Sequence, residues 1–181
     1  IKNNVKNIIS KFPEYKYHFG VVKANCYGID NDDLKVTEAI IDGGCNYLAV
    51  ATLEEAISVR EKFKDIPILV LGHINNVHLK DAIEYNITVT IHSEESLEEI
   101  INQNLNGLKA HIKINTGMNR LGINKNLKDL YEKCISNNIE IEGIFSHIYN
   151  ASNEEDYNKQ IEIFEKLLKE IDISKIKIIH I

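Results

Sequence analysis

Short runs of apolar residues alternate with longer amphipathic stretches along the whole chain. Most of the apolar runs are continuous over four or five residues, which is typical of parallel strands that are buried on both faces. The stretches between them carry apolar residues at helical spacing. We therefore predict strands at 18–24, 47–51, 66–71, 87–91, 110–114, 141–147 and 175–181.

The segments between the predicted strands show recognisable helix starts. Thr52 followed by Glu55 predicts a capping box, and Ser93 followed by Ser96 predicts a second helix start. A strand and a helix recur every ~20–35 residues, which indicates right-handed βαβ units. One helix opens the chain, and the others are predicted at 32–42, 53–63, 77–85, 94–103, 127–136 and 154–170.

Composition narrows the function classes. The 181 residues are 44% hydrophobic and 27% charged, with a net charge of -6, so a substantial core is expected and no basic stripe is available for nucleic acid. No apolar run approaches the ~20 residues that span a bilayer. The cysteines Cys26, Cys45 and Cys134 are scattered without metal-ligand spacing, which favours reduced thiols in a cytoplasmic setting. Cys26 is interpreted as a small buried hydrophobe, with a reactive thiol as the alternative.

Lys23 closes the first predicted strand, within the segment HFGVVKANCYG at 18–28. An apolar strand stands behind this lysine, and a polar turn containing glycine follows it. Such surroundings lower an ammonium pKa by desolvation and leave an amine able to attack a carbonyl group. The alternative is a strand-terminal lysine that extends into solvent.

The segment around Lys23 resembles the signature of the alanine racemase family, the barrel-type enzymes that use pyridoxal phosphate (PLP). In that family the lysine holds the cofactor as a Schiff base. Four later segments are similar to family motifs and occur in family order: AVATLEEA at 49–56, PILVLG at 67–72, HIKINTGMNRLG at 111–122 and EGIFSH at 142–147. The resemblance therefore covers nearly the whole chain.

Polar motif residues follow several predicted strands that are not adjacent. Lys23 ends the first strand, Arg120 follows the fifth, and His147 ends the sixth, a distribution typical of the active face of a (β/α)8 TIM-type barrel. A doubly wound sheet would gather them at one switch point, and the chain has no Gly-x-Gly-x-x-Gly motif there. Seven of the eight strands of such a barrel are predicted within 1–181. We expect this stretch to be an incomplete PLP-binding domain, with the eighth strand and a β-rich C-terminal domain outside it.

The resemblance implies roles for particular residues. Lys23 would be the catalytic, cofactor-bearing lysine, and Tyr27 would reach the cofactor phosphate, with packing on the barrel rim as the alternative. Arg120 would bind the phenolic oxygen of the cofactor ring and contact the substrate; a permanently charged guanidinium suits that anion. The only other arginine, Arg60, lies in a charged stretch and is interpreted as a solvated surface residue.

Three further residues take conditional roles from the resemblance. Lys113 corresponds to a lysine that is carbamylated in many members and braces the arginine; an unmodified lysine paired to a carboxylate is the alternative. On a strand it would point to the same side as His111. His147 would pack near the cofactor ring, unless it is a core histidine bonded to the backbone. His180 would support an arginine outside this chain. No metal site is expected from the remaining histidines, His18, His73, His78 and His92.

The resemblance implies a PLP-dependent isomerase that interconverts L- and D-alanine, or serine, and supplies D-amino acid for peptidoglycan. Its second acid–base group would be a tyrosine of the partner subunit in a homodimer. Departures from the family pattern at Ile29, Asp30, Asn115 and Asn119 leave the preferred amino acid open. The alternatives are a related PLP-barrel decarboxylase and a non-catalytic PLP-binding barrel. A cytoplasmic location is expected, and the presence of a membrane domain in the parent polypeptide is left open.

Overall fold

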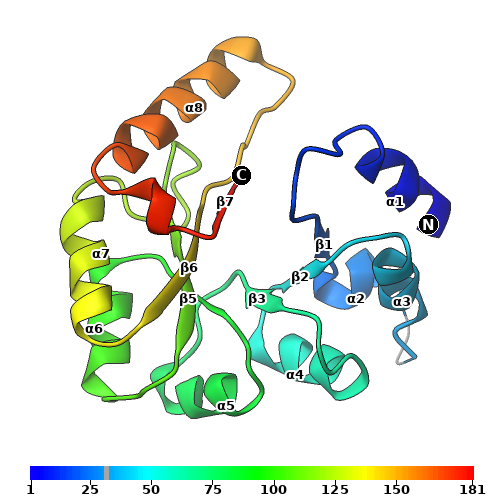
Figure 1. Ribbon diagram of the computed structural model, residues 1–181, viewed down its shortest axis with the longest axis horizontal. Coiled ribbons are helices and arrows are strands. Elements are labelled where there is room, and N and C mark those ends of the chain that lie inside the picture. The colour runs from blue at the N-terminus through cyan, green and yellow to red at the C-terminus, as the bar shows by residue number, and fades with distance from the viewer. Residues whose placement is uncertain (31–32) are drawn as a thin grey trace.

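The computed structural model describes residues 1–30 and 33–181, and it has an inner layer of strands surrounded by helices (Figure 1). The strands are β1 (Phe19–Val21), β2 (Tyr47–Val50), β3 (Ile68–Val70), β4 (Val89–Ile91), β5 (Lys109–Lys113), β6 (Glu140–Phe145) and β7 (Ile178–His180). The helices are α1 (Lys2–Ile9), α2 (Lys23–Gly28), α3 (Lys35–Asp42), α4 (Leu53–Lys62), η1 (Asn76–His78), α5 (Leu79–Glu84), α6 (Glu94–Asn102), α7 (Leu127–Ser136), α8 (Glu154–Leu168) and η2 (Ile173–Lys175).

All the paired strands run parallel and follow one another in chain order. β1, β2 and β3 form one sheet, and β4 to β7 form a second. Thr88 joins the two sheets, because its N–H donates to Ile68 and its carbonyl accepts from Val70, both at 2.9 Å. At the outer edges, the rings of Phe19 on β1 and His180 on β7 stack with centroids 4.4 Å apart. The predicted TIM-type barrel with seven strands in the described residues is confirmed.

The strands are buried on both faces, as their continuous apolar runs predicted. Alternate residues such as Leu48 and Ile68 pack outward against the helices. Their neighbours, including Tyr47 and Leu69, point inward and form a separate cluster inside the barrel with Phe145. Successive side chains along each strand therefore point alternately outward, into the core under the helices, and inward, into the barrel interior.

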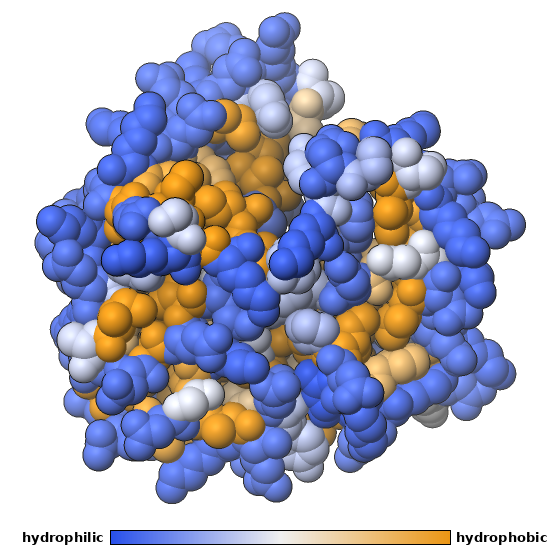
Figure 2. All heavy atoms as spheres, viewed as in Figure 1, coloured by the Kyte–Doolittle hydropathy of each residue, from blue (hydrophilic) through white to orange (hydrophobic). Residues whose placement is uncertain are grey.

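The outer surface of the molecule is mostly hydrophilic. Figure 2 shows hydrophilic residues over most of the outer rim, with hydrophobic residues gathered in patches between them. Within residues 1–30 and 33–181, no helix is both long enough and apolar enough to cross a membrane.

The largest departures from the predicted elements lie at their ends. The first strand ends at Val21 instead of residue 24, because the backbone turns left-handed from Ala24 onward. The helix predicted at 77–85 divides into η1 and α5. The helix predicted at 32–42 is α3 from Lys35, and its predicted first residue, Asp32, lies outside the described residues. The capping box at Ser93 and Ser96 is confirmed.

Polar side chains fill the end of the barrel at which the strands begin. Glu142 of β6, whose side chain is 8% exposed, accepts hydrogen bonds from Thr88 at 3.1 Å and from Lys177 at 3.1 Å. The hydroxyl of Tyr47 at the start of β2 contacts both Thr88 and Glu142, at 3.1 and 3.4 Å. Tyr47, Thr88 and Glu142 lie on β2, directly before β4 and on β6, an alternation that is usual for one layer of a barrel interior, and Lys177 reaches Glu142 from directly before β7. We call this group the floor network.

Arg60 lies at the same end, and the prediction of a solvated surface residue was wrong. Its side chain is buried, and its guanidinium donates five hydrogen bonds to described backbone carbonyls. The acceptors lie just after α4 and around the end of α5, so one planar group satisfies carbonyls that the helix ends leave unpaired. The acceptors are the carbonyl oxygens of Phe63, Lys64, Ile66, Tyr85 and Asn86, at 2.7–3.0 Å.

Candidate active site

Lys23 is the first residue of α2, which follows the C-terminal end of β1 and is a left-handed turn rather than a regular helix. The four residues that follow it, Ala24, Asn25, Cys26 and Tyr27, have φ between 50° and 60°. Left-handed backbone costs an L-residue about 1–2 kcal/mol. Four consecutive non-glycine residues in this region are therefore strained, and strain of this kind is characteristic of functional sites.

The turn is held by contacts on its inner side. The N–H of Cys26 donates to the carbonyl of Val22 at 3.1 Å, and the buried Cys26 thiol lies 3.4 Å from the Thr37 hydroxyl and 3.6 Å from the Asp30 carboxylate. Asp30 in turn accepts the N–H groups of Val36 and Thr37 at 2.9 Å. Burial raises the pKa of the Cys26 thiol, which supports the structural interpretation of this cysteine over a reactive one.

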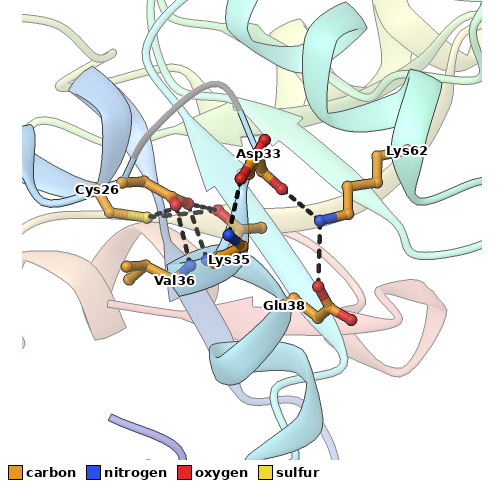
Figure 3. A network of polar contacts seen from close by, with 8 residues as sticks. Cys26, Asp33, Lys35, Val36, Glu38 and Lys62 are labelled. Atoms are coloured by element: carbon orange, nitrogen blue, oxygen red, sulfur yellow. Dashed lines mark hydrogen bonds and ion pairs between the residues drawn. The ribbon is translucent and has the colours of Figure 1, made fainter.

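The first turn of α3 is fastened to α4 as well. Figure 3 shows Lys62 reaching from α4 to the backbone carbonyl of Asp33 and to the carboxylate of Glu38, which lies 3.1 Å away. The Asp33 carboxylate pairs with Lys35 at 2.8 Å. The segment after Lys23 is thus connected through α3 to the helix that follows β2.

Glu55 also contacts this turn. Its N–H donates to the Thr52 hydroxyl at 3.3 Å, so the predicted helix start is present. Its carboxylate does not return to Thr52 as a capping box requires, and that half of the prediction was wrong. The two oxygens accept the N–H groups of Ala24 at 2.8 Å and Ala51 at 2.7 Å.

Lys113, Arg120 and His147 share the end of the barrel at which Lys23 lies. Burial lowers the pKa of Lys113, and the charges of Arg120 and Lys23 lower it further. The pKa of His147 is also lowered, by burial first and then by Lys113, Arg120 and Lys23. Within the described residues the Lys113 ammonium has no hydrogen bond or ion pair, and it lies 5.4 Å from the ring centroid of Phe145. Lys23, Lys113, Arg120 and His147 thus form a cluster of basic side chains at this end of the barrel.

A chain of hydrogen bonds braces the two segments that carry Arg120 and His147. The buried Gln160 of α8 donates to the Thr116 hydroxyl at 2.8 Å and to the His147 carbonyl at 2.9 Å. The Ser146 hydroxyl donates to the Ile114 carbonyl at 2.9 Å, so the 2.7 Å contact between Thr116 and Ser146 has Thr116 as its donor. Every donor and acceptor in this chain is paired, which fixes the orientation of the Gln160 amide.

The loop after β5, together with His92 and Ser93, lines an open pocket of about 300 Å³ beside Arg120. The Asn115 carboxamide holds this loop by accepting the N–H groups of Gly117 and Asn119, at 3.1 and 3.0 Å. It also donates to the Asn119 side chain at 3.0 Å. These contacts connect the two positions of this loop that depart from the family pattern.

The other predicted site residues lie at the edge of this cluster or below it. Tyr27 is 67% exposed, and its ring centroid is 5.9 Å from the Lys23 ammonium. His180 lies deeper, with its ring stacked on Phe19 and Phe145 and its Nε2 2.9 Å from Nδ1 of His111. Burial lowers the pKa of both histidines to about 3. His180 therefore belongs to the barrel interior, as a neutral ring.

Several residues at this end had no predicted role. His73 and His92 follow adjacent strands, and their ring nitrogens lie 3.2 Å apart. Gln160 lies on a predicted helix and His111, in the barrel interior, lies within a recognised motif, but their hydrogen-bond partners are distant in the chain and gave no local signal. Glu55 was predicted only as part of a helix start, from its spacing to Thr52. In the part of the chain that the structure describes, no three His, Cys, Asp or Glu side chains are placed to hold a metal ion.

Comparison with known proteins agrees with this geometry. The family model described as "Alanine racemase, N-terminal domain" matches residues 1–181. The chain is 36% identical over 185 residues to the alanine racemase of Helicobacter acinonychis. The matched stretch covers 98% of this chain and 48% of that protein. It superimposes with a TM-score of 0.87 and 30% identity on the alanine racemase from E. faecalis, covering 94% of this chain and 48% of the other. The alanine racemase from Bacillus anthracis with bound L-Ala-P gives a TM-score of 0.87 at 29% identity, covering 99% and 48%. The chain thus spans about half the length of these relatives.

Proposed function

We propose that this chain, which belongs to the alanine racemase family, forms the PLP-holding barrel of an amino-acid racemase that interconverts L- and D-alanine, with serine as the alternative substrate. The observation that carries the proposal is the placement of Lys23 on a strained turn beside Lys113, Arg120 and His147. Clustered cations of this kind need an anionic partner, and PLP provides one.

The residues present fit PLP. The cofactor carries a phosphate and a ring oxygen that are both anionic at neutral pH, and Lys113 and His147 have pKa values lowered partly by the surrounding positive charge. A bound anion would relieve that repulsion. When bound, PLP would supply an electron sink that makes the α-proton of an amino acid acidic.

Each residue of the site then has a definite task. Lys23 would hold the cofactor through its ε-amine and would take or return the α-proton at one face of the substrate. Arg120 would bind the ring oxygen and the substrate, since its exposed guanidinium has no protein partner within the described residues. Tyr27 would reach the phosphate from the rim. His147 would line the ring, and His180 would support an arginine that lies outside this chain.

Lys113 is the residue whose chemistry would change. Burial and the adjacent positive charges favour its neutral amine, which can add to CO₂ and release one proton to form a carbamate. The carbamate would carry a negative charge beside Arg120, so that repulsion between the two side chains becomes an ion pair. This proposal is supported by the absence of any carboxylate partner for Lys113 among the described residues.

Racemisation also needs a second acid–base group on the opposite face, and we propose that a tyrosine of the partner subunit in a homodimer supplies it. The D-amino acid would serve peptidoglycan synthesis in the cytoplasm. These points follow from the family resemblance.

The test is to incubate the full-length protein with L-alanine and PLP in D₂O. The expected result is D-alanine with deuterium at the α-carbon, measured by chiral chromatography and mass spectrometry. Release of CO₂ would indicate the decarboxylase instead, and PLP binding without α-deuteration would indicate the non-catalytic barrel. L-Serine in a parallel reaction measures the substrate preference.

A further inference from the structure

The strained turn after Lys23 needs a partner at its first residue, and Glu55 provides it. The N–H of Ala24 follows directly after Lys23 and donates to Oε1 of Glu55 at 2.8 Å. The other oxygen, Oε2, accepts the N–H of Ala51 at 2.7 Å, just beyond the end of β2. One carboxylate therefore ties the start of the turn to the end of the neighbouring strand.

Glu55 is well suited to this role. It lies in the first turn of α4, where the helix dipole favours a negative charge. Its carboxylate makes no ion pair with any described residue, so both oxygens are available to the backbone. Hydrogen bonds from N–H groups to an ionised carboxylate are about twice as strong as neutral ones.

The other contacts of the turn lie further along the chain. Cys26 and Asp30 hold its middle and its end, by the Cys26 N–H to Val22 and the Asp30 N–H to Asn25 at 2.8 Å. Ala24 is the residue at which φ first becomes positive, at 50°. The Glu55 contact is therefore made by the residue at which the chain changes direction, directly after Lys23.

We infer that Glu55 is a positioning residue for Lys23, which orients the lysine by holding Ala24 and Ala51 at fixed places around its carboxylate. The inference rests on the proposed function only in taking Lys23 as the cofactor lysine. It concerns the arrangement of the backbone, and it can be tested without turnover.

Glu55→Gln is the sharpest variant, because it keeps the size of the side chain. Glutamine has one oxygen acceptor, so its NH₂ group would meet the N–H of either Ala24 or Ala51 as donor against donor. Glu61→Gln is the matched control. Glu61 is exposed on the same helix, and its replacement by glutamine removes the same charge.

Two readouts are compared in the full-length protein. Amide hydrogen exchange without cofactor should show at least about 10-fold faster exchange of Ala24 or Ala51 in Glu55→Gln than in Glu61→Gln. PLP affinity, from the absorbance change on titration, should fall by about 10²-fold in Glu55→Gln alone, as a misplaced reactive group predicts. Thermal unfolding checks that both variants remain folded at the temperature of measurement.

The outcomes separate the two proposals. If Ala24 and Ala51 exchange as slowly in Glu55→Gln as in the control, the inference is overturned, whatever the protein binds. A lower melting temperature with unchanged PLP affinity would make Glu55 merely structural and would also overturn it. Failure of the unmodified protein to take up PLP would overturn the proposed function instead, while the exchange measurement would still decide on the contact with Glu55.

Discussion

At the end of the barrel where the strands begin, the buried carboxylate of Glu142 is bonded by Thr88 and Lys177, whereas at the opposite end Lys113 is buried without a polar partner among the described residues. The two arginines repeat this contrast. Arg60 uses its guanidinium on backbone carbonyls at the first end, and Arg120 is exposed at the second.

The difference indicates what each end is for. Paired polar groups lower the free energy of the folded chain and leave nothing for a ligand to bind. Unpaired cations at the other end raise that free energy, and a bound anion would recover it. One end of the barrel is therefore organised for stability, and the arrangement of the other supports the proposed binding of an anion.

Replacing Lys23 by Ala should have the largest effect on the binding end. Loss of both the covalent attachment and the acid–base group should lower kcat/KM for alanine racemisation by about 10³-fold or more. Thermal unfolding of the cofactor-free protein should be nearly unchanged, because Lys23 is only half-buried and forms no hydrogen bond within the described residues. Racemisation at the original rate would contradict the role of Lys23.

The two arginines allow the two ends of the barrel to be compared by the same substitution, arginine to lysine, made once at each end. Arg60→Lys should reduce the free energy of unfolding by about 3 kcal/mol, because an ammonium cannot reach carbonyls in separate segments and leaves several unpaired. Arg120→Lys should leave stability unchanged and lower PLP affinity. Urea denaturation and PLP titration of both variants measure this, and equal stability losses would remove the distinction between the ends.

The layer between the two ends should respond to acid. His111 and His180 have folded pKa values of about 3 against 6.5 for an unperturbed imidazole, so the unfolded chain binds more protons between those values. Stability should therefore fall as the pH drops below 6.5, by on the order of 2 kcal/mol for each ring at about pH 5. Urea denaturation from pH 7 to pH 5 measures the loss.

His111→Gln should flatten that pH dependence, and replacement of the exposed His78 by Gln should not. A profile of the same slope in all three proteins would mean that the pair is not neutral in the folded state. The layer between the two ends of the barrel would then carry a charge in the folded state.

Glu142→Gln tests the floor network and should have the smallest effect. The amide keeps an oxygen for Thr88 and loses the charged contact to Lys177, which is half-exposed and therefore weakly stabilising. The expected loss in the free energy of unfolding is about 1 kcal/mol, with PLP affinity unchanged. A drop in PLP affinity would show that the two ends are coupled.

Much of the fold could be predicted from local pattern. Strands buried on both faces, such as β2 and β3, reveal themselves as continuous apolar runs, and Ser93 with Ser96 marks the start of α6 within four residues. The motif positions of Lys23, Arg120 and His147 after different strands also predicted that they share one end of the barrel.

The sequence by itself therefore determined the order of the elements, because apolar runs and helix starts depend on neighbours within a few positions. The TIM-type barrel and the candidate residues at its mouth came from the order of the motifs along the chain and from the family resemblance that they carry. Only the tertiary structure decided what Arg60, Glu55 and His111 do. Their partners lie up to 69 residues away, as in the pair of His111 with His180, and hydrogen bonds of that range leave no periodic trace in the chain. The left-handed turn after Lys23 is the clearest case, since Ala24 disfavours it locally and only contacts such as the one with Glu55 hold it.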